Sequence, residues 1–189
     1  MEALLGIGTA FGLSTSAGLN AYIPLLLVSV LTRLGVLQPE DPYTVLGSPW
    51  VIGVLSVLLL IEFFVDKIPA VDTANDVVQT FVRPAAGALM FASQSNLVSD
   101  VSPVLAVVAG ILLAGSVHTA KGAVRPVVTA STAGTGNWFV SIVEDIIALL
   151  GSILAIVMPF IVMIFAAIAS LWIFRWYRRR QANLNTATS

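Results

Sequence analysis

Charged side chains interrupt long apolar segments of this sequence, and several of them fall at helical spacing. Glu62 precedes Asp66 by four residues, and His118, Lys121 and Arg125 follow one another at intervals of three and four. Residues three or four apart share one face of a helix. An ionised group in hydrocarbon costs about 2.5–3.5 kcal/mol, so such groups are expected only where they pair or line a hydrated cavity.

Composition sets the fold class, because 58% of the 189 residues are hydrophobic and only 10% are charged. Soluble domains are much less apolar. A membrane pass needs roughly 20 apolar residues, so about six passes fit in this length. We therefore expect an all-α, polytopic helical membrane bundle. Residues 1–181 would form a single transmembrane domain, and residues 182–189 a disordered tail.

The ends of the chain suggest how it is oriented. The apolar N-terminus carries Glu2 where a secretory signal would carry Lys or Arg, so we expect it to be retained. Four arginines follow the last apolar run, and the positive-inside rule then places the C-terminus in the cytoplasm. These arginines are Arg175, Arg178, Arg179 and Arg180. The predicted location is the cell (cytoplasmic or inner) membrane, with several passes.

The first apolar stretch, residues 3–34, is interrupted at residues 14–20 by small residues that form helix poorly. Each flanking piece is too short to span a membrane. The pattern predicts a re-entrant hairpin or a broken helix, which is tolerated only where the opened backbone is buried or hydrated. The alternative is one kinked spanning helix.

The middle of the chain is predicted to contain a water-facing loop followed by three apolar helices. The loop covers residues 38–49, and Pro84 should kink the second of the three helices. The predicted helices cover residues 50–65, 72–93 and 103–128.

A second interruption, at residues 130–137, resembles the first in composition, and Val82-Arg83-Pro84 recurs as Val124-Arg125-Pro126. These sequence similarities suggest an inverted repeat of residues 1–93 and 102–181, as many transporters have. Residues 138–152 would then form a half-helix that returns to its starting side. The alternative is two tightly connected passes kinked near Pro159.

Several of these motifs together resemble the prokaryotic domain-of-unknown-function 4126 membrane family, over roughly residues 3–154. The resemblance implies a membrane fold and highlights charged positions, but it implies no substrate. The motifs are the run Gly18-Leu19-Asn20-Ala21-Tyr22-Ile23-Pro24-Leu25-Leu26, the run from Glu62 through Asp66-Lys67-Ile68-Pro69 to Asp72 and Asp76, Arg83-Pro84, and Ser141 with Glu144-Asp145.

The charges within apolar segments do not balance. The acids are Glu62, Asp66, Asp72, Asp76, Glu144 and Asp145, and the bases are Lys67, Arg83, Lys121 and Arg125. With a neutral His118, two carboxylates lack a basic partner, and a buried carboxylate without one takes up a proton or holds a cation. His118 could relay protons. The flanks of Pro69, with Asp66, Lys67 and Asp72, could instead be a solvated turn.

Other residues complete the predicted solute or ion pathway. Asn20 and Asn137 follow the two breaks and could cap the next helices or contact a passenger, with Tyr22 and Ser141 beside them. We expect no enzyme: Ser141 and His118 lack a nucleophile elbow, and one His without Cys makes a transition-metal site improbable, so no cofactor is predicted.

These observations predict a transporter or channel for a small solute or ion, coupled to protons or cations through the carboxylates. The alternatives are a translocase for anionic lipid headgroups and a non-transporting scaffold of buried ion pairs. The expected partners are the bilayer and a small solute, proton or cation, with no nucleic acid. A homodimer is compatible with the apolar segment 153–176, which has no evident internal role.

Overall fold

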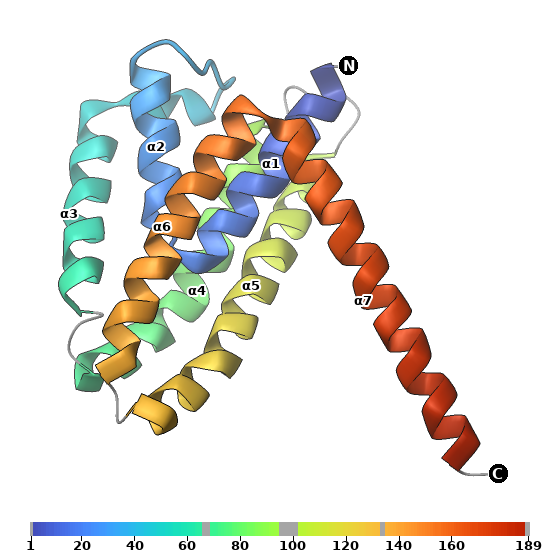
Figure 1. Cartoon of the computed structure of the whole chain (residues 1–189). Coiled ribbons are helices and arrows are strands. Elements are labelled where there is room, and N and C mark those ends of the chain that lie inside the picture. The colour runs from blue at the N-terminus through green and yellow to red at the C-terminus, as the bar shows by residue number, and fades with distance from the viewer. Residues whose placement is uncertain (1, 66–68, 95–101, 133–134, 188–189) are drawn as a thin grey trace.

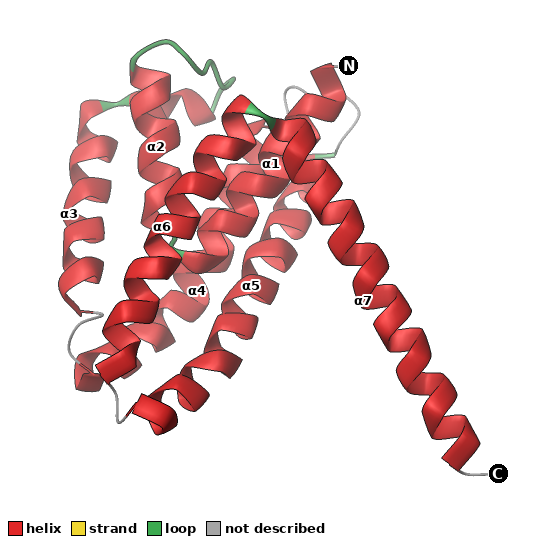
Figure 2. Cartoon of the chain, in the orientation of Figure 1, coloured by secondary structure: helices red, strands yellow, loops and turns green. Residues whose placement is uncertain are grey.

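The protein is all-helical in the part of the chain that the computed structural model describes, residues 2–65, 69–94, 102–132 and 135–187 (Figures 1 and 2). This confirms the predicted fold class. The helices are α1 (Glu2–Leu19), α2 (Tyr22–Arg33), the 3-10 helix η1 (Tyr43–Gly47), α3 (Pro49–Val65), α4 (Pro69–Gln94), α5 (Pro103–Thr132), α6 (Thr135–Val157) and α7 (Pro159–Ala187).

Helices α1 and α2 form a hairpin that enters the bundle and returns to the same end (Figure 1). The chain turns at Asn20 and Ala21, halfway through the bundle, while the small residues before Asn20 remain helical. Pro24 favours a turn at this position. A helix that continued through Asn20 would place the Pro24 ring against the Asn20 carbonyl, whereas proline is tolerated in the first turn of a new helix.

The small residues of α1 form the packing surface at the centre of the bundle. The Ser14 hydroxyl donates to the Gly87 carbonyl of α4 at 2.9 Å, and the Thr9 hydroxyl donates to the Ala155 carbonyl of α6 at 3.0 Å. A Cβ on Gly18 would lie 2.6 Å from the Ala114 carbonyl oxygen of α5. Two of the residues that we expected to break the helix, Ser14 and Gly18, therefore bring α4 and α5 close to it, and Thr9 joins it to α6.

Helices α4 and α5 cross at a contact between two glycines. A Cβ on Gly110 would lie 2.3 Å from the Gly87 carbonyl oxygen and 2.6 Å from the Ala88 Cα atom. Both neighbours are backbone atoms, which cannot rotate away. This crossing fixes the positions of the charged side chains that α4 and α5 carry.

The second half of the chain differs from the predicted repeat. The second interruption separates α5 from α6, and each of these helices is long and apolar enough to cross a membrane by itself. Residues 133 and 134 lie outside the described residues. The half-helix expected at residues 138–152 is therefore wrong, because α6 continues to Val157 and α7 begins at Pro159. The structure instead has two long helices, α6 and α7, connected at Met158 directly before Pro159.

Helix α7 packs against α1 and α6 near its start and then diverges from the bundle (Figure 1). An elongated groove lies between α7 and the bundle, lined by residues of α1, α5, α6 and α7. Its wall combines apolar side chains such as Phe11 and Phe165 with hydroxyl groups such as Thr15 and Ser170.

Candidate functional site

Charged side chains from four helices meet at the turn between α1 and α2. We call this set the charge network: Glu62 of α3, Asp76 and Arg83 of α4, His118, Lys121 and Arg125 of α5, and Glu144 of α6. Two other predicted positions cannot be placed in it. Asp66 lies outside the described residues, as does the side chain of Asp72.

One half of the charge network is built around Arg83. Its Nη2 atom lies 3.2 Å from Glu62 Oε1, and the two side chains are only 1% and 2% exposed. Arg83 Nη1 lies 3.2 Å from His118 Nδ1, and His118 Nε2 lies 3.1 Å from the Thr80 hydroxyl. Arg83 therefore joins α3, α4 and α5 through one guanidinium group.

The contacts of His118 assign its tautomer. A guanidinium group can only donate hydrogen bonds, so Nδ1 must accept from Arg83 and the proton must be on Nε2. Nε2 then donates to the Thr80 hydroxyl, whose own proton goes to the Asp76 carbonyl oxygen at 2.8 Å. His118 is thus a neutral imidazole within a continuous chain of hydrogen bonds.

The other half of the charge network is built around Glu144. Its Oε2 atom lies 2.7 Å from Lys121 Nζ and 3.6 Å from Arg125 Nη2. Arg125 Nη1 also contacts Asp76 Oδ2 at 3.3 Å, and Lys121 Nζ donates to the Leu19 carbonyl at 3.2 Å. The network therefore reaches the last residue of α1, where the α1–α2 hairpin turns.

Asn20 links that turn to α6. Its Oδ1 atom accepts from the backbone N–H groups of Tyr22 and Ile23, at 2.9 and 3.1 Å, and so caps α2. Its Nδ2 atom donates to Asp145 Oδ1 at 2.9 Å. The predicted capping role is confirmed, and in this arrangement the side chain uses both of its ends within the protein.

The other residues predicted beside the breaks have different environments. Tyr22 is buried, with its side chain near Gln79. Asn137 does not cap α6, because it lies inside the first turn and accepts from the Thr129 hydroxyl at 3.0 Å. Ser141 is buried on α6, one turn before Asp145.

Gln79 belongs to the site although the sequence analysis did not select it. It is 1% exposed, and among the described residues its Oε1 atom and the Arg83 Nε atom have no hydrogen-bond partner. Unsatisfied polar atoms this deep are uncommon and often mark a bound water. The sequence could have indicated Gln79 by its spacing, because it lies four residues before Arg83 and three after Asp76 and so shares their face of the helix.

Three of the four predicted pathway acids whose side chains the structure describes have basic partners. Glu62 pairs with Arg83, Asp76 with Arg125, and Glu144 with Lys121 and Arg125. Asp145 accepts from the Asn20 amide. Sequence gives the number of charges but not the partners on other helices, which here neutralise Glu62, Asp76 and Glu144 locally.

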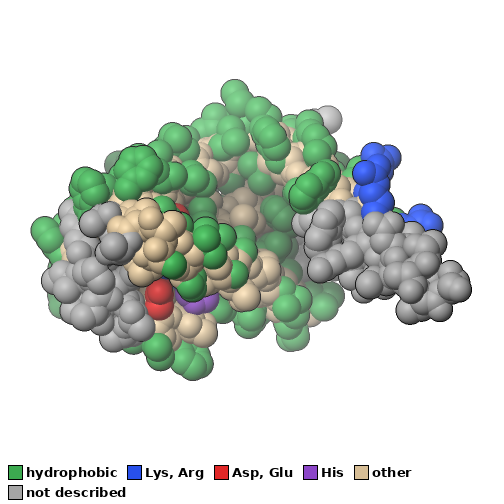
Figure 3. Space-filling view, turned by 60° about the horizontal axis from the view of Figure 1, so that its bottom comes forward, with side chains coloured by type: hydrophobic (Ala, Val, Ile, Leu, Met, Phe, Trp, Pro, Cys, Tyr) green, Lys and Arg blue, Asp and Glu red, His purple; other side chains and the backbone are tan. Residues whose placement is uncertain are grey.

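The exposed fraction of the side chains in the charge network decreases from one end of the bundle to its middle. The Asp76 side chain is 35% exposed, Glu144 is 13% and Lys121 is 4%. Figure 3 shows this end of the molecule, where the histidine and an acidic side chain lie side by side among apolar groups. The network is thus open at the end where α4 begins and closed at Leu19.

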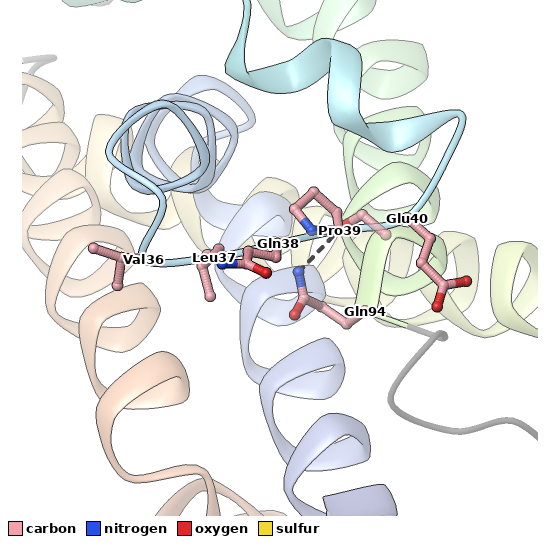
Figure 4. Close-up of a pocket in the computed structure, with 7 residues that line it drawn as sticks. Val36, Leu37, Gln38, Pro39, Glu40 and Gln94 are labelled. Atoms are coloured by element: carbon pink, nitrogen blue, oxygen red, sulfur yellow. Dashed lines mark hydrogen bonds between the residues drawn. The ribbon is translucent and has the colours of Figure 1, made fainter.

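A separate pocket of about 340 Å³ lies at the opposite end, between residues 36–40 and the end of α4 (Figure 4). Gln94 faces the loop there and is 5% exposed. No member of the charge network lines this pocket. The described residues also contain no cluster of three His, Cys, Asp or Glu side chains that could hold a metal ion.

Comparison with known proteins gives a family but no activity. No curated protein and no solved structure matches the chain. The family model described as Domain of unknown function (DUF4126) matches residues 7–179, which is most of the sequence. The chain therefore belongs to the DUF4126 family, as its motifs had suggested.

Proposed function

We propose that this protein is a multi-pass protein of the cytoplasmic membrane, with its C-terminus in the cytoplasm. The surface supports this location. The apolar windows of α5 and α6 are only 17% and 22% buried, whereas the apolar core helix of a soluble protein is mostly covered. Large apolar side chains such as Leu112 and Leu150 are 66% and 60% exposed. A lipid bilayer is the environment in which such an exposed apolar surface is stable.

The orientation follows from the arginines after the apolar part of α7. Figure 1 places the end of α7 at the end of the bundle where α4 begins. With the positive-inside rule, that end faces the cytoplasm and the α1–α2 hairpin enters from the other side. The exposed part of the charge network, at Asp76, would then open toward the cytoplasm.

We propose further that the protein carries a small solute or ion across the membrane, coupled to a proton or cation. The observation that carries this proposal is the contact between the charge network and the broken helix, Lys121 Nζ to the Leu19 carbonyl. Transporters place coupling-ion sites at broken helices near the middle of the membrane. Burying an array of charges that runs from an exposed end to such a break costs free energy. Charges of this kind inside membrane proteins commonly mark the pathway of a substrate or an ion.

In the proposed mechanism, the structure represents the closed state. Protonation of Glu144 would weaken its hold on the Lys121 ammonium and on the Arg125 guanidinium. Arg125 would keep Asp76 as a partner, while Lys121 would keep only the Leu19 carbonyl. The contact between α5 and α6 would loosen, so the path would open first at the end of the bundle where Asp76 is exposed.

Flux measurements in liposomes test this function. Glu144→Gln should reduce proton- or cation-dependent flux at least tenfold, because glutamine cannot exchange a proton. Glu40→Gln is the matched control, since Glu40 is an exposed acid in the loop before η1. Equal flux in the wild type and both variants would remove the charge network from the mechanism.

A scaffold of buried ion pairs is the second candidate, and one observation favours it: each described acid of the network has a basic partner. A scaffold would show no flux in the wild type, while Glu144→Gln would still lower the unfolding temperature. Lipid headgroup translocation has less support. The lining of the groove beside α7 includes no Arg or Lys, and the Arg83 and Lys121 side chains are only 1% and 4% exposed.

A further inference from the structure

The C-terminal end of α1 lies inside the bundle, where its carbonyl groups need partners. The last carbonyls of a helix have no intrahelical donors and carry the negative end of the helix dipole. The Asn20 N–H satisfies the Ser16 carbonyl at 3.1 Å. The Leu19 carbonyl is satisfied instead by the Lys121 ammonium, which reaches it from α5.

The same ammonium contacts Glu144 Oε2 of α6 at 2.7 Å. A positive charge is therefore held between a helix-end carbonyl and a carboxylate, supplied by two different helices and almost removed from solvent. Carbonyl and carboxylate oxygens are the ligands that hard cations prefer, and the C-terminal ends of broken helices coordinate sodium ions or protons in transporters.

We propose that these oxygens form a monovalent-cation site, which the Lys121 ammonium fills in this protein. The Lys121 side chain takes the place of a free ion, so removing it should allow sodium to bind beside Glu144. The charge of the surroundings sets the class of ion. Arg125 Nη2 lies 3.6 Å from Glu144 Oε2, so a divalent ion would add a positive charge next to a guanidinium group, whereas a monovalent ion restores the balance.

The site has a consequence for coupling, and this consequence alone rests on the proposed transport function. A tethered ammonium cannot leave with the passenger, but it can exchange a proton with Glu144. The wild-type protein would therefore couple to protons and would be insensitive to sodium.

Thermal unfolding of the purified protein in detergent tests the site without any flux. The Lys121→Ala variant and the wild type are compared in sodium chloride and in choline chloride at equal ionic strength. At about ten times its dissociation constant, sodium should raise the unfolding temperature of the variant by about 3–6 °C relative to choline. The wild type should show no difference between the two salts.

Two further variants locate the effect. Lys121→Arg keeps a tethered cation and should show no sodium response. Lys121→Ala with Glu144→Gln removes the carboxylate ligand and should lose the response of the single variant. Together these results would place the bound sodium at the position of the ammonium.

Three outcomes would overturn the proposal. The first is a helical, monodisperse Lys121→Ala protein with equal unfolding temperatures in sodium and choline, and the second is an equal sodium response in the wild type. The third is failure of Lys121→Ala, Lys121→Gln and Lys121→Met to fold in sodium as well as in choline, because bound sodium should replace the lost charge. Absence of wild-type flux would refute transport but leave this binding result unchanged.

Discussion

The ion pair between Glu62 and Arg83 gives the most direct test of how the interior is stabilised. Each side chain is at most 2% exposed, and their atoms approach to 3.2 Å. Removing one partner of a buried pair leaves a charge that neither water nor protein compensates, at a cost of about 3–5 kcal/mol. Glu62→Met and Arg83→Met should each lose about this much stability.

The double variant should behave differently from the sum of the single ones. Replacing both partners by apolar residues of similar volume is often neutral, so Glu62→Met with Arg83→Met should lie within about 2 kcal/mol of the wild type. For a chain of this length, 1 kcal/mol corresponds to about 2–4 °C in unfolding temperature. Each single variant should therefore unfold about 6–20 °C earlier, and the double variant at most about 8 °C earlier.

Thermal unfolding in detergent, followed by circular dichroism, measures all three variants. Arg33→Met is the control for loss of an arginine, since Arg33 is exposed at the end of α2 and should change the unfolding temperature little. Additive losses in the double variant would refute this account, because they would mean that the two charges do not depend on each other.

Three other substitutions test the packing and the hairpin, each by its unfolding temperature in detergent. Gly110→Ala should lower the free energy of unfolding by about 3 kcal/mol or more, because the new Cβ would meet the backbone of α4. Gly122→Ala has open space at its Cβ, so it should be neutral or stabilising by up to about 1 kcal/mol. Similar losses in the two variants would contradict the close crossing of α4 and α5. Asn20→Ala should cost about 0.5–2 kcal/mol through the lost cap, and Asn20→Ser should recover part of it; no recovery would mean that capping is not the main role. Thr9→Val should cost about 0.6–1.7 kcal/mol through the lost bond to α6, and an unchanged unfolding temperature would show that this bond contributes nothing.

The helices themselves could be predicted from the sequence because their signals are local. Apolar length, polar links and the prolines that start α3, α4, α5 and α7 are visible along the chain, and the predicted helix at residues 50–65 matches α3 (Pro49–Val65) within one residue. The spacing of charges also placed Lys121 and Arg125 correctly on one buried face of α5. These properties depend only on neighbours in sequence.

The two interruptions show where composition is insufficient. Both contain small residues, Gly and then Asn, yet only the first is a turn inside the bundle. Pro24 follows Asn20 by four residues, while Ser141 stands at the same distance after Asn137. Pro24 lies in the first turn of α2, where proline is tolerated, whereas the second Asn has no proline after it and is part of α6. The backbone of α5 and α6 therefore does not repeat the short hairpin of α1 and α2.

The partners of the charges could not be predicted, because they depend on how helices from distant parts of the chain pack. Glu62 and Arg83 are 21 residues apart, and Lys121 meets a backbone carbonyl 102 residues away. Regular spacing along one helix cannot identify contacts between different helices. The same holds for Gln79, whose unsatisfied oxygen is evident only once α4 is packed against its neighbours.

The hairpin and the charge network act as one mechanical unit, which limits how the protein can move. Helix α1 is fixed to α4 and α6 through Ser14 and Thr9, so its end at Leu19 cannot shift far by itself. A change in the Lys121 contact with Leu19 must therefore come from movement of α5 or of its side chain. Gly110 packs closely against α4, and Ala114 and Val117 pack closely against Gly18 of α1, so the segment of α5 after Val117 is held mainly by its charged side chains. Any opening driven by Glu144 should thus begin at the end of the bundle where Asp76 is exposed.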